Sequence, residues 1–312
     1  MSFWFKNLTL FRLSEHALPD FATLDAALSR RPFHPCSGLD WFAQGWSTPA
    51  PHCPDIMVFP QKTQALISLR REDKVLPASV IRELTDEKVA EIESTEHRTL
   101  GRKEKLELKA RITDDLLPKA FVRRSHIRAL LAPTAGWLVV DSSQAARAEE
   151  LLSSLREAVP PLPARLVHTA LSPETAMTQW LLDEPPAGFA LDADCELKSP
   201  EADGAVVRCV RQDLSADEIR RHLESGKRAT RLGLIWQDRI RFVLTDTLQI
   251  KRLQFLDILQ EEASQAGDDM PSLFEASLHI MGHEIVALCD ALMLALGGEV
   301  TLDGSAAEIS EA

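Results

Sequence analysis

The chain has 312 residues, of which 45% are hydrophobic and 26% charged, values that are typical of a folded globular protein and exclude a chain too polar to fold. Its length allows two or three packed units. Its formal net charge of −12 argues at first against a nucleic-acid partner, and we find no apolar run of the roughly 18 residues that cross a bilayer, so no membrane partner is expected.

The cysteines and the first residues indicate the compartment. The five cysteines are scattered and odd in number, which favours a reducing environment over a disulfide framework. The opening MSFWFKNLTLFRL lacks the basic, apolar and small-residue order of a signal peptide. We therefore expect a cytoplasmic protein.

The first quarter of the chain alternates between strand and helix patterns. Residues 3–13 are apolar and aromatic and predict a buried strand, and residues 20–30 have helical character. Residues 31–54 are rich in Pro, His and Trp and predict an irregular, packed connection. Residues 56–59 and 65–69 predict a pair of strands.

Residues 77–117 predict two long, charged helices. Pro77 suits the first turn of a helix, Gly101 interrupts the helical spacing, and Pro118 ends it. The apolar stripe is narrow, so little of these helices can be buried in a large core. We expect a protruding helical hairpin.

The remaining chain reads as a second alternation of strands and helices. Residues 136–140 predict a strand, Ser142 or Ser143 caps a helix that ends near Val159, and Pro160, Pro161 and Pro163 mark the best domain boundary. The elements expected beyond it are a strand at 166–169, a helix after Ser172, a strand at 204–211, a capping box at 215–218, antiparallel strands over 229–253, and a helix over 273–296 that Gly297-Gly298 stops.

These elements divide the chain into four parts. Residues 1–76 and 118–163 form a central α+β domain, residues 77–117 a helical tip, residues 164–298 a base α+β domain, and residues 299–312 an acidic flexible tail.

The charge distribution reverses the impression that the net charge gives. Residues 98–128 hold ten Lys and Arg against four Asp and Glu, and residues 206–252 hold eleven against six. Non-specific DNA binding depends on the local face that meets phosphates, not on the sum over the chain. The alternative for any one such run is a solvated face of a helix or strand.

The basic runs predict contacts with the phosphates of double-stranded DNA. Arg and Lys bind phosphates whatever the base sequence, and Gln adds a neutral hydrogen bond. No recognition helix, zinc finger or RNA-binding signature predicts base readout. Aromatic residues are only 6%, with no tyrosine, so stacking on single strands is less favoured than duplex contact. The candidate DNA-binding residues are Arg98, Arg102, Lys103, Lys119, Arg123, Arg124, Arg208, Arg211, Gln212, Lys227, Arg231, Arg239, Lys251 and Arg252.

Catalytic and metal motifs are mostly missing from the sequence. There is no G-x-G-x-x-G, phosphate-binding loop or G-x-S-x-G. His279 and His283 have the i, i+4 spacing of a metal pair and Glu284 follows them, but the H-E-x-x-H order is absent. We expect no enzyme, no catalytic or metal site and no cofactor. Two alternatives stay open: a metal-dependent nucleic-acid-processing enzyme that uses these three residues, and a protein-interaction module that uses the acidic exterior.

An ordered set of short segments resembles the recombination-associated RdgC family. The resemblance runs from residue 3 to about Gly298, and no single motif decides it. Its segments are Trp4-Phe5-Lys6-Asn7-Leu8, Leu116-Leu117-Pro118-Lys119-Ala120-Phe121, Gln212-Asp213-Leu214, Gly226-Lys227, Trp236-Gln237-Asp238-Arg239-Ile240 and Lys251-Arg252-Leu253.

The resemblance implies an α+β fold, with a multi-unit, horseshoe-like monomer that forms a ring-shaped homodimer through its tips and its bases. Duplex DNA would pass through a basic hole without sequence preference, in the nucleoid, and the protein would antagonise RecA. Phe121 would be an apolar anchor at the tip contact of the dimer, the alternative being an ordinary core phenylalanine. The matching positions put Arg98, Arg211 and Gln212 first among the DNA contacts. Family members can carry a basic residue where Val210 stands here, which weakens that local patch by one charge.

Overall fold

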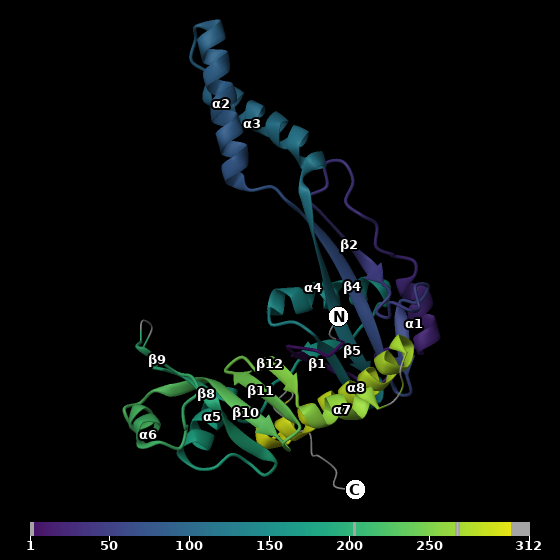
Figure 1. The fold of residues 1–312 in the computed structure, drawn as a ribbon, viewed down its shortest axis with the longest axis vertical. Coiled ribbons are helices and arrows are strands. Elements are labelled where there is room, and N and C mark those ends of the chain that lie inside the picture. The colour runs from purple at the N-terminus through teal and green to yellow at the C-terminus, as the bar shows by residue number, and fades with distance from the viewer. Residues whose placement is uncertain (1–2, 202–203, 266, 268, 301–312) are drawn as a thin grey trace.

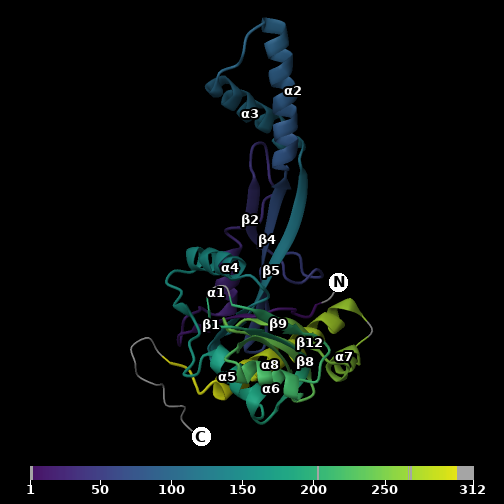
Figure 2. The ribbon, with the colours of Figure 1, turned by 90° about the vertical axis from the view of Figure 1, so that its left-hand side faces the viewer.

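The computed structural model describes residues 3–201, 204–265, 267 and 269–300. These residues form a mixed α+β fold with two antiparallel sheets, as the α+β expectation requires. A seven-stranded sheet lies near the middle of the molecule, a helical hairpin stands at one end of it, and a five-stranded sheet lies at the other end (Figures 1 and 2).

The seven-stranded sheet has the order β2-β4-β5-β6-β1-β7, and β3 pairs with β4 outside this path. Its apolar residues alternate between two faces, so each face needs a cover. Helices α1 (Phe21–Leu28) and α4 (Ala145–Ala158) pack on one face, and α8 (Met270–Ala295) packs on the other. The strands are β1 (Thr9–Leu13), β2 (Phe42–Ser47), β3 (Val58–Gln61), β4 (Gln64–Val75), β5 (Phe121–Ala132), β6 (Trp137–Val140) and β7 (Ala164–Leu166).

Strands β4 and β5 extend beyond the rest of this sheet. They pair without interruption from Ala65 opposite Leu131 to Val75 opposite Phe121. Five of the first six residues of β5, from Phe121 to His126, are exposed, whereas five of its last six are buried. The two strands therefore act as a stalk that carries the hairpin away from the core (Figure 1).

The hairpin consists of α2 (Ala78–Glu96) and α3 (Arg102–Leu116), which confirms the two charged helices predicted there. Helix α2 ends at His97, whose φ of 51° is left-handed. Glu104 caps α3 by accepting a hydrogen bond of 2.9 Å from the Gly101 amide. No residue of α3 is buried, as the narrow apolar stripe predicted. The short 3-10 helix Leu117–Lys119 then leads into β5.

The five-stranded sheet has the order β12-β11-β10-β8-β9. Its strands are β8 (Phe189–Lys198), β9 (Val206–Cys209), β10 (Arg228–Trp236), β11 (Ile240–Thr245) and β12 (Ile250–Phe255). Leu232, Leu234 and Phe242 point into the core, toward α5 (Pro173–Leu182) and α6 (Asp217–Glu224). These helices lie on the side of the sheet away from the hairpin in both views (Figures 1 and 2), so the other face is turned toward the hairpin.

Helix α8 joins the two sheets and corrects the expectation that no segment is apolar enough to cross a membrane. It has 26 residues and a mean hydropathy of 1.5 over its most apolar window, so by length and composition it passes as a candidate span. Half of that window is buried, and Leu288 and Leu292 belong to the core that both sheets share. Gly282 lets α8 approach the β3–β4 turn, because an added Cβ would lie 2.0 Å from Oε1 of Gln64.

Several other predictions need correction. The connection expected at residues 31–54 contains β2, and β5, β8 and helix α7 (Asp257–Ser264) were not predicted. Ser215 does not cap α6, because its hydroxyl donates to Asp213, and the N-cap is Ala216. The N-cap of α4 is Gln144, not Ser142 or Ser143.

The ends of the expected base unit make contacts with the first sheet. Strand β7 pairs with β1, although its residues follow the prolines at which we placed the boundary. Glu299 pairs with Thr169 and forms an ion pair of 2.7 Å with Arg12, so the chain is still packed at the start of the expected tail. Residues 301–312 of that tail lie outside the described residues.

Candidate nucleic-acid interface

The structure distributes the predicted DNA-binding residues over five places: the hairpin tip, the stalk, the exposed face of the five-stranded sheet, the segments beside that face, and the β10–β11 turn. We call the cations Arg208, Arg231, Lys251 and Arg252 the basic face, because they line one pocket of about 210 Å³ on the exposed side of the sheet. Three different strands supply them, so only the folded sheet brings them together.

Carboxylates partly neutralise the basic face. Glu196 on β8 accepts a hydrogen bond of 2.6 Å from Nε of Arg208 and lies 3.8 Å from Nη1 of Arg231. Asp194 lies 3.1 Å from Nη1 of Arg252. Arg241 shares this side of the sheet and pairs with Asp192 at 3.3 Å. Lys251 forms no ion pair within the described part of the chain. Internal carboxylates hold most of these guanidinium groups in position.

The pKa of Glu196 depends on burial, which raises it, and on its positively charged neighbours, which lower it. Burial acts to raise it, but the hydrogen bond from Arg208, the charge of Arg231 and a hydrogen bond from Thr230 outweigh burial. The pKa of Glu196 is therefore lowered, and the carboxylate is ionised at neutral pH.

Arg211 and Gln212 follow β9 at the edge of the basic face. Arg211 is exposed, with a left-handed φ of 54°, and its backbone amide donates to Oδ1 of Asp194. The Gln212 side chain donates to Glu218 at 3.3 Å. Val210 is 66% exposed. Lys227 precedes β10, and its ammonium lies 3.2 Å from the Ser225 hydroxyl.

Arg239 lies elsewhere than the basic face. It belongs to the β10–β11 turn, where its Nη2 donates to Oε1 of Glu284 on α8 at 2.6 Å. Helix α8 covers the opposite side of the sheet, so this arginine joins a turn to the core helix. The sequence grouped Arg239 with Lys251 and Arg252, but the fold places it apart from them, against α8.

The hairpin tip carries Arg98, Arg102 and Lys103. Arg98 bonds Glu96 at 2.6 Å and Glu104 at 2.9 Å. Arg102 and Lys103 occupy the first turn of α3, where the positive end of the helix dipole disfavours cations. The Lys103 side chain is 91% exposed. Lys103 forms an i, i+4 ion pair of 3.8 Å with Glu107, whereas Arg102 forms no ion pair within the described residues.

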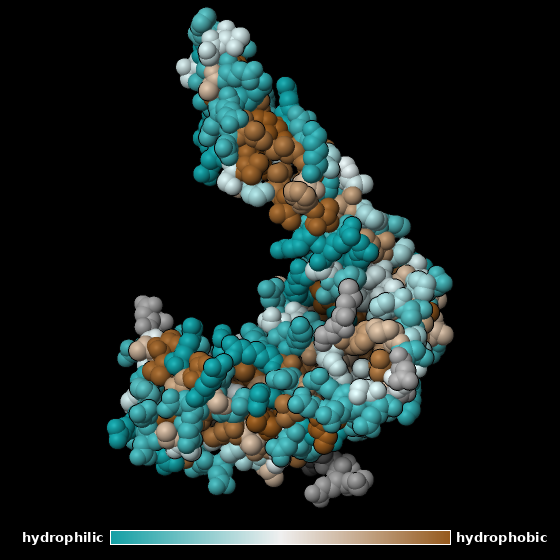
Figure 3. Space-filling view, in the orientation of Figure 1, coloured by the Kyte–Doolittle hydropathy of each residue, from teal (hydrophilic) through white to brown (hydrophobic). Residues whose placement is uncertain are grey.

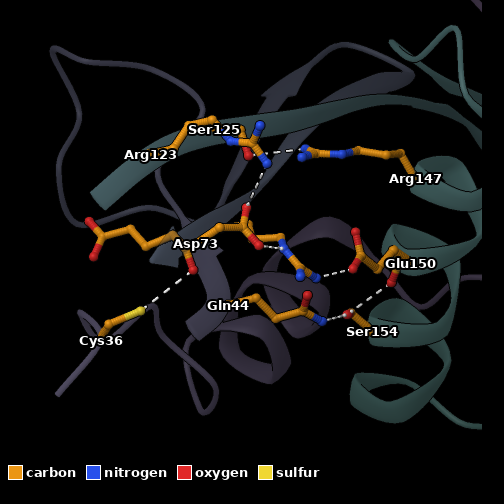
Figure 4. A network of polar contacts seen from close by, with 10 residues as sticks. Cys36, Gln44, Asp73, Arg123, Ser125, Arg147, Glu150 and Ser154 are labelled. Carbon is orange, nitrogen blue, oxygen red and sulfur yellow. Dashed lines mark hydrogen bonds and ion pairs between the residues drawn. The ribbon is translucent and has the colours of Figure 1, made fainter. Parts of the chain in front are cut away.

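Arg123 and Arg124 are neighbours in sequence but point to opposite faces of the stalk. Arg123 lies 3.7 Å from Asp73, which also binds Arg71, and Arg71 bonds Glu150 on α4 (Figure 4). Arg147 of α4 donates to Ser125 on the same face.

The opposite face of the stalk holds a second ion cluster. There Arg124 bonds Glu72 at 3.0 Å, and Arg70 bonds the same carboxylate at 2.7 Å. Glu72 is only 2% exposed, and the Cys36 thiol donates to its carbonyl oxygen. Alternation along β5 thus separates two arginines that the sequence grouped together.

Phe121 begins β5 and is 87% exposed, so the alternative of a core phenylalanine is wrong. Lys119 is exposed just before it. Val75, opposite Phe121, is 45% exposed, and Val122 is 39% exposed. Close by, α2 and α3 diverge around an apolar groove of about 420 Å³ that Leu84, Ile92, Leu108, Ile112 and Leu116 help to line. Figure 3 shows apolar surface at the hairpin.

The three residues of the metal-site alternative, His279, His283 and Glu284, do not point to one place. His279 and His283 are exposed on α8, whereas Glu284 is buried and bonded to Arg239. Burial and the nearby Lys62 lower the pKa of His279. Within the described residues, no three His, Cys, Asp or Glu side chains gather as a metal site would require.

These features define an α+β protein that carries cations from distant segments on exposed surfaces and a charged helical hairpin with an apolar groove. A family model described as "Putative exonuclease, RdgC" matches residues 3–299, and the chain belongs to this RdgC family. Three similar proteins are each named recombination-associated protein RdgC. That of Laribacter hongkongensis is 57% identical over 95% of this chain and 99% of its own length. Those of Neisseria gonorrhoeae and Pseudomonas aeruginosa are 45% and 42% identical over 95% of this chain and 99% and 98% of theirs.

Proposed function

We propose that this protein acts in recombination by binding double-stranded DNA without reading its sequence. The observation that carries the proposal is the basic face, a set of cations from separate strands on the side of the sheet turned toward the hairpin. Arginine and lysine contacts to phosphates fix the position of a duplex and carry no sequence information. The names of the relatives support the role in recombination.

We further propose that two copies close into a ring around the duplex. The open outline between the hairpin and the five-stranded sheet supports a horseshoe-like monomer (Figure 3). The exposed Phe121 and the apolar groove of the hairpin support one contact between copies, and the two bases would form the other. A two-fold axis presents each cation twice, so a modest patch on one chain becomes a collar around the DNA.

Such a ring would oppose RecA by covering duplex in the nucleoid, with no chemistry required. The salt dependence of binding tests the DNA contact. The logarithm of the association constant should fall with the logarithm of salt concentration by about 0.9 for each phosphate neutralised. Because a dimeric ring presents each cation twice, slope changes are counted per chain. Replacing Arg231 or Lys251 by Gln should lower the slope by about 1 per chain on every sequence tested. A flat salt dependence for the native protein contradicts the proposal.

A second experiment tests the ring and its consequence. Class averages of the DNA-free dimer should show a closed annulus, and pre-binding to duplex should slow RecA-mediated strand exchange. Phe121→Ala should abolish both the closed annulus and the slowing of strand exchange. Open or monomeric particles that still inhibit RecA would contradict encirclement.

The family description keeps nuclease activity as the alternative. Incubation of plasmid and linear DNA with Mg²⁺, Mn²⁺ or Zn²⁺ tests it. Reproducible cleavage that His283→Ala abolishes would replace the clamp with the enzyme. We expect intact DNA under every condition.

A further inference from the structure

Two cysteines that are 14 residues apart in sequence lie directly opposite each other on β8 and β9, at the edge of the sheet that carries the basic face. Cys195 on β8 pairs with Cys209 on β9 in the antiparallel register. Opposite residues of antiparallel strands have Cα atoms about 4.5 to 5.5 Å apart. Disulfides span Cα separations of about 4.4 to 6.8 Å. The backbone therefore already has the spacing of a disulfide, and both cysteines are free thiols.

The two thiols differ in access. Cys195 is buried, and burial together with the adjacent Cys209 thiol raises its pKa to about 12. Cys209 is half-buried. Cys195 also pairs with Leu232, whose side chain points into the core, so both thiols lie on the core side of the sheet and face away from Arg208 and Glu196. An oxidant from solvent reaches the half-buried Cys209 before the buried Cys195. Among the other cysteines, Cys289 is wholly buried in the core around α8, and Cys36 donates to a backbone carbonyl.

We propose that Cys195 and Cys209 form a reversible disulfide when a peroxide oxidises the protein. The Cys209 sulfur attacks the O–O bond and becomes a sulfenic acid, and the peroxide leaves as water. The Cys195 sulfur then displaces the hydroxyl from that sulfenic acid, and its own proton leaves with the hydroxyl as a second water. Two thiols and one hydrogen peroxide thus give one disulfide and two waters. A small thiol reverses the reaction by exchange.

The disulfide would attach β9, a short strand at the edge of the sheet, to its neighbour β8. β9 has four residues, and β8 is its neighbour in the sheet, so β9 is an edge strand. It carries Arg208 and leads directly to Arg211 and Gln212. Cross-linking it to β8 would hold these groups in place for contact with DNA. This consequence, unlike the disulfide itself, rests on the proposed function.

The first test uses the full chain without DNA. Reduced protein is treated with hydrogen peroxide, remaining thiols are alkylated, and peptides are mapped by mass spectrometry. We expect a cross-linked peptide that joins Cys195 to Cys209, the loss of these two thiols to alkylation, and full recovery with a reductant. Cys36→Ser combined with Cys53→Ser is the matched control and should cross-link normally. Recovery of Cys195 as a free thiol beside sulfinic acid at Cys209 overturns the proposal, as does a cross-link to another cysteine.

The second test separates this proposal from the proposed function. Amide hydrogen exchange in β9 should slow after oxidation, and the oxidised protein should bind a short duplex more tightly than the reduced protein, because Arg208, Arg211 and Gln212 are already held in place. If the reduced protein binds no DNA but the disulfide forms, the proposed function fails and the thiol pair stands. If DNA binds and the disulfide does not form, the thiol pair fails alone. If oxidation leaves the affinity for DNA unchanged, the link between the thiol pair and the DNA surface is overturned.

Discussion

Glu196 accepts a hydrogen bond of 2.6 Å from Arg208 and thereby occupies a guanidinium that would otherwise be free to meet a phosphate. The same carboxylate lies 3.8 Å from Arg231, so one acidic side chain restrains two cations of the basic face. The side chain of Glu196 is 14% exposed, whereas that of Arg208 is 71% exposed. The carboxylate thus orients the arginines and also weakens their attraction for a polyanion.

Replacing Glu196 by Gln should therefore strengthen DNA binding. The neutral amide keeps the shape of the side chain, releases the charge of Arg208, and removes a negative charge that repels phosphates. We expect tighter binding and a salt slope steeper by up to about 1, measured by fluorescence anisotropy on a short duplex. Glu224→Gln, on a helix that covers the other face of the sheet, is the control and should change neither quantity. Weaker binding by Glu196→Gln would mean that positioning outweighs repulsion.

The lowered pKa of Glu196 also predicts how stability depends on pH. A carboxylate whose pKa is lower in the folded state stabilises the fold above its unfolded value, here 4.5, and this contribution is lost as the pH falls through the folded value. The native protein should therefore lose stability below pH 4.5 more steeply than Glu196→Gln, which cannot titrate there. Urea unfolding at a series of pH values measures the difference. Parallel curves for the two proteins would contradict this assignment.

The stalk offers a test with two adjacent arginines. In Figure 1, α4 lies on the side of β4 and β5 toward which the five-stranded sheet extends, and Arg123 is on the α4 face. Arg123→Gln should reduce the salt slope of DNA binding by about 1 with little change in stability. Arg124→Gln should leave the slope unchanged and lower the free energy of unfolding by about 1 kcal/mol, because the buried Glu72 loses one of its two partners. The reverse assignment would show that the other face of the stalk meets DNA.

These two arginines also show where prediction from the sequence succeeded and failed. The hairpin was predictable because Pro77, Gly101 and Pro118 punctuate it and its helices have local periodicity. Strand β5 was not, because its first half is exposed on both faces and its second half is buried on both, which removes the alternation that identifies a strand. Without that strand, Arg123 and Arg124 could only be grouped by their position in sequence.

The basic face shows the same limit at longer range. The basic runs were visible in the sequence, but Arg252 meets Asp194 only because strands β12 and β8 belong to one sheet. The pairing of Cys195 with Cys209 depended on β8, a strand that the sequence did not predict. Residue type predicted which side chains could bind phosphate, and strand register decided which of them came together.

Phe121 provides the test of the expected contact between copies. A side chain that is 87% exposed contributes little to the core, so Phe121→Ala should leave the thermal unfolding of the monomer, measured at a concentration too low for the dimer, nearly unchanged. If Phe121 anchors the dimer, its truncation should weaken self-association by about 2 to 4 kcal/mol, as for a central interface residue. Sedimentation equilibrium measures this loss. Glu15→Ala, at a position of the central domain whose side chain is 92% exposed, is the control outside both expected contacts and should leave the dimer intact. An unchanged dimer for Phe121→Ala would remove this residue from the interface.

Arg239 should behave as a structural residue, although its sequence neighbourhood grouped it with the DNA contacts. Its guanidinium donates from both Nε and Nη2 to Glu284, whose side chain is 8% exposed. Arg239→Met keeps most of the side-chain volume but leaves that carboxylate without its charged partner, which should cost roughly 1 to 3 kcal/mol of unfolding free energy. The double variant Arg239→Met with Glu284→Met should recover part of this loss, because neither position then holds an unpaired charge. The salt slope of DNA binding should match that of the native protein in both variants. If Arg239→Met instead reduces the salt slope by about 1 and leaves stability unchanged, Arg239 contacts DNA.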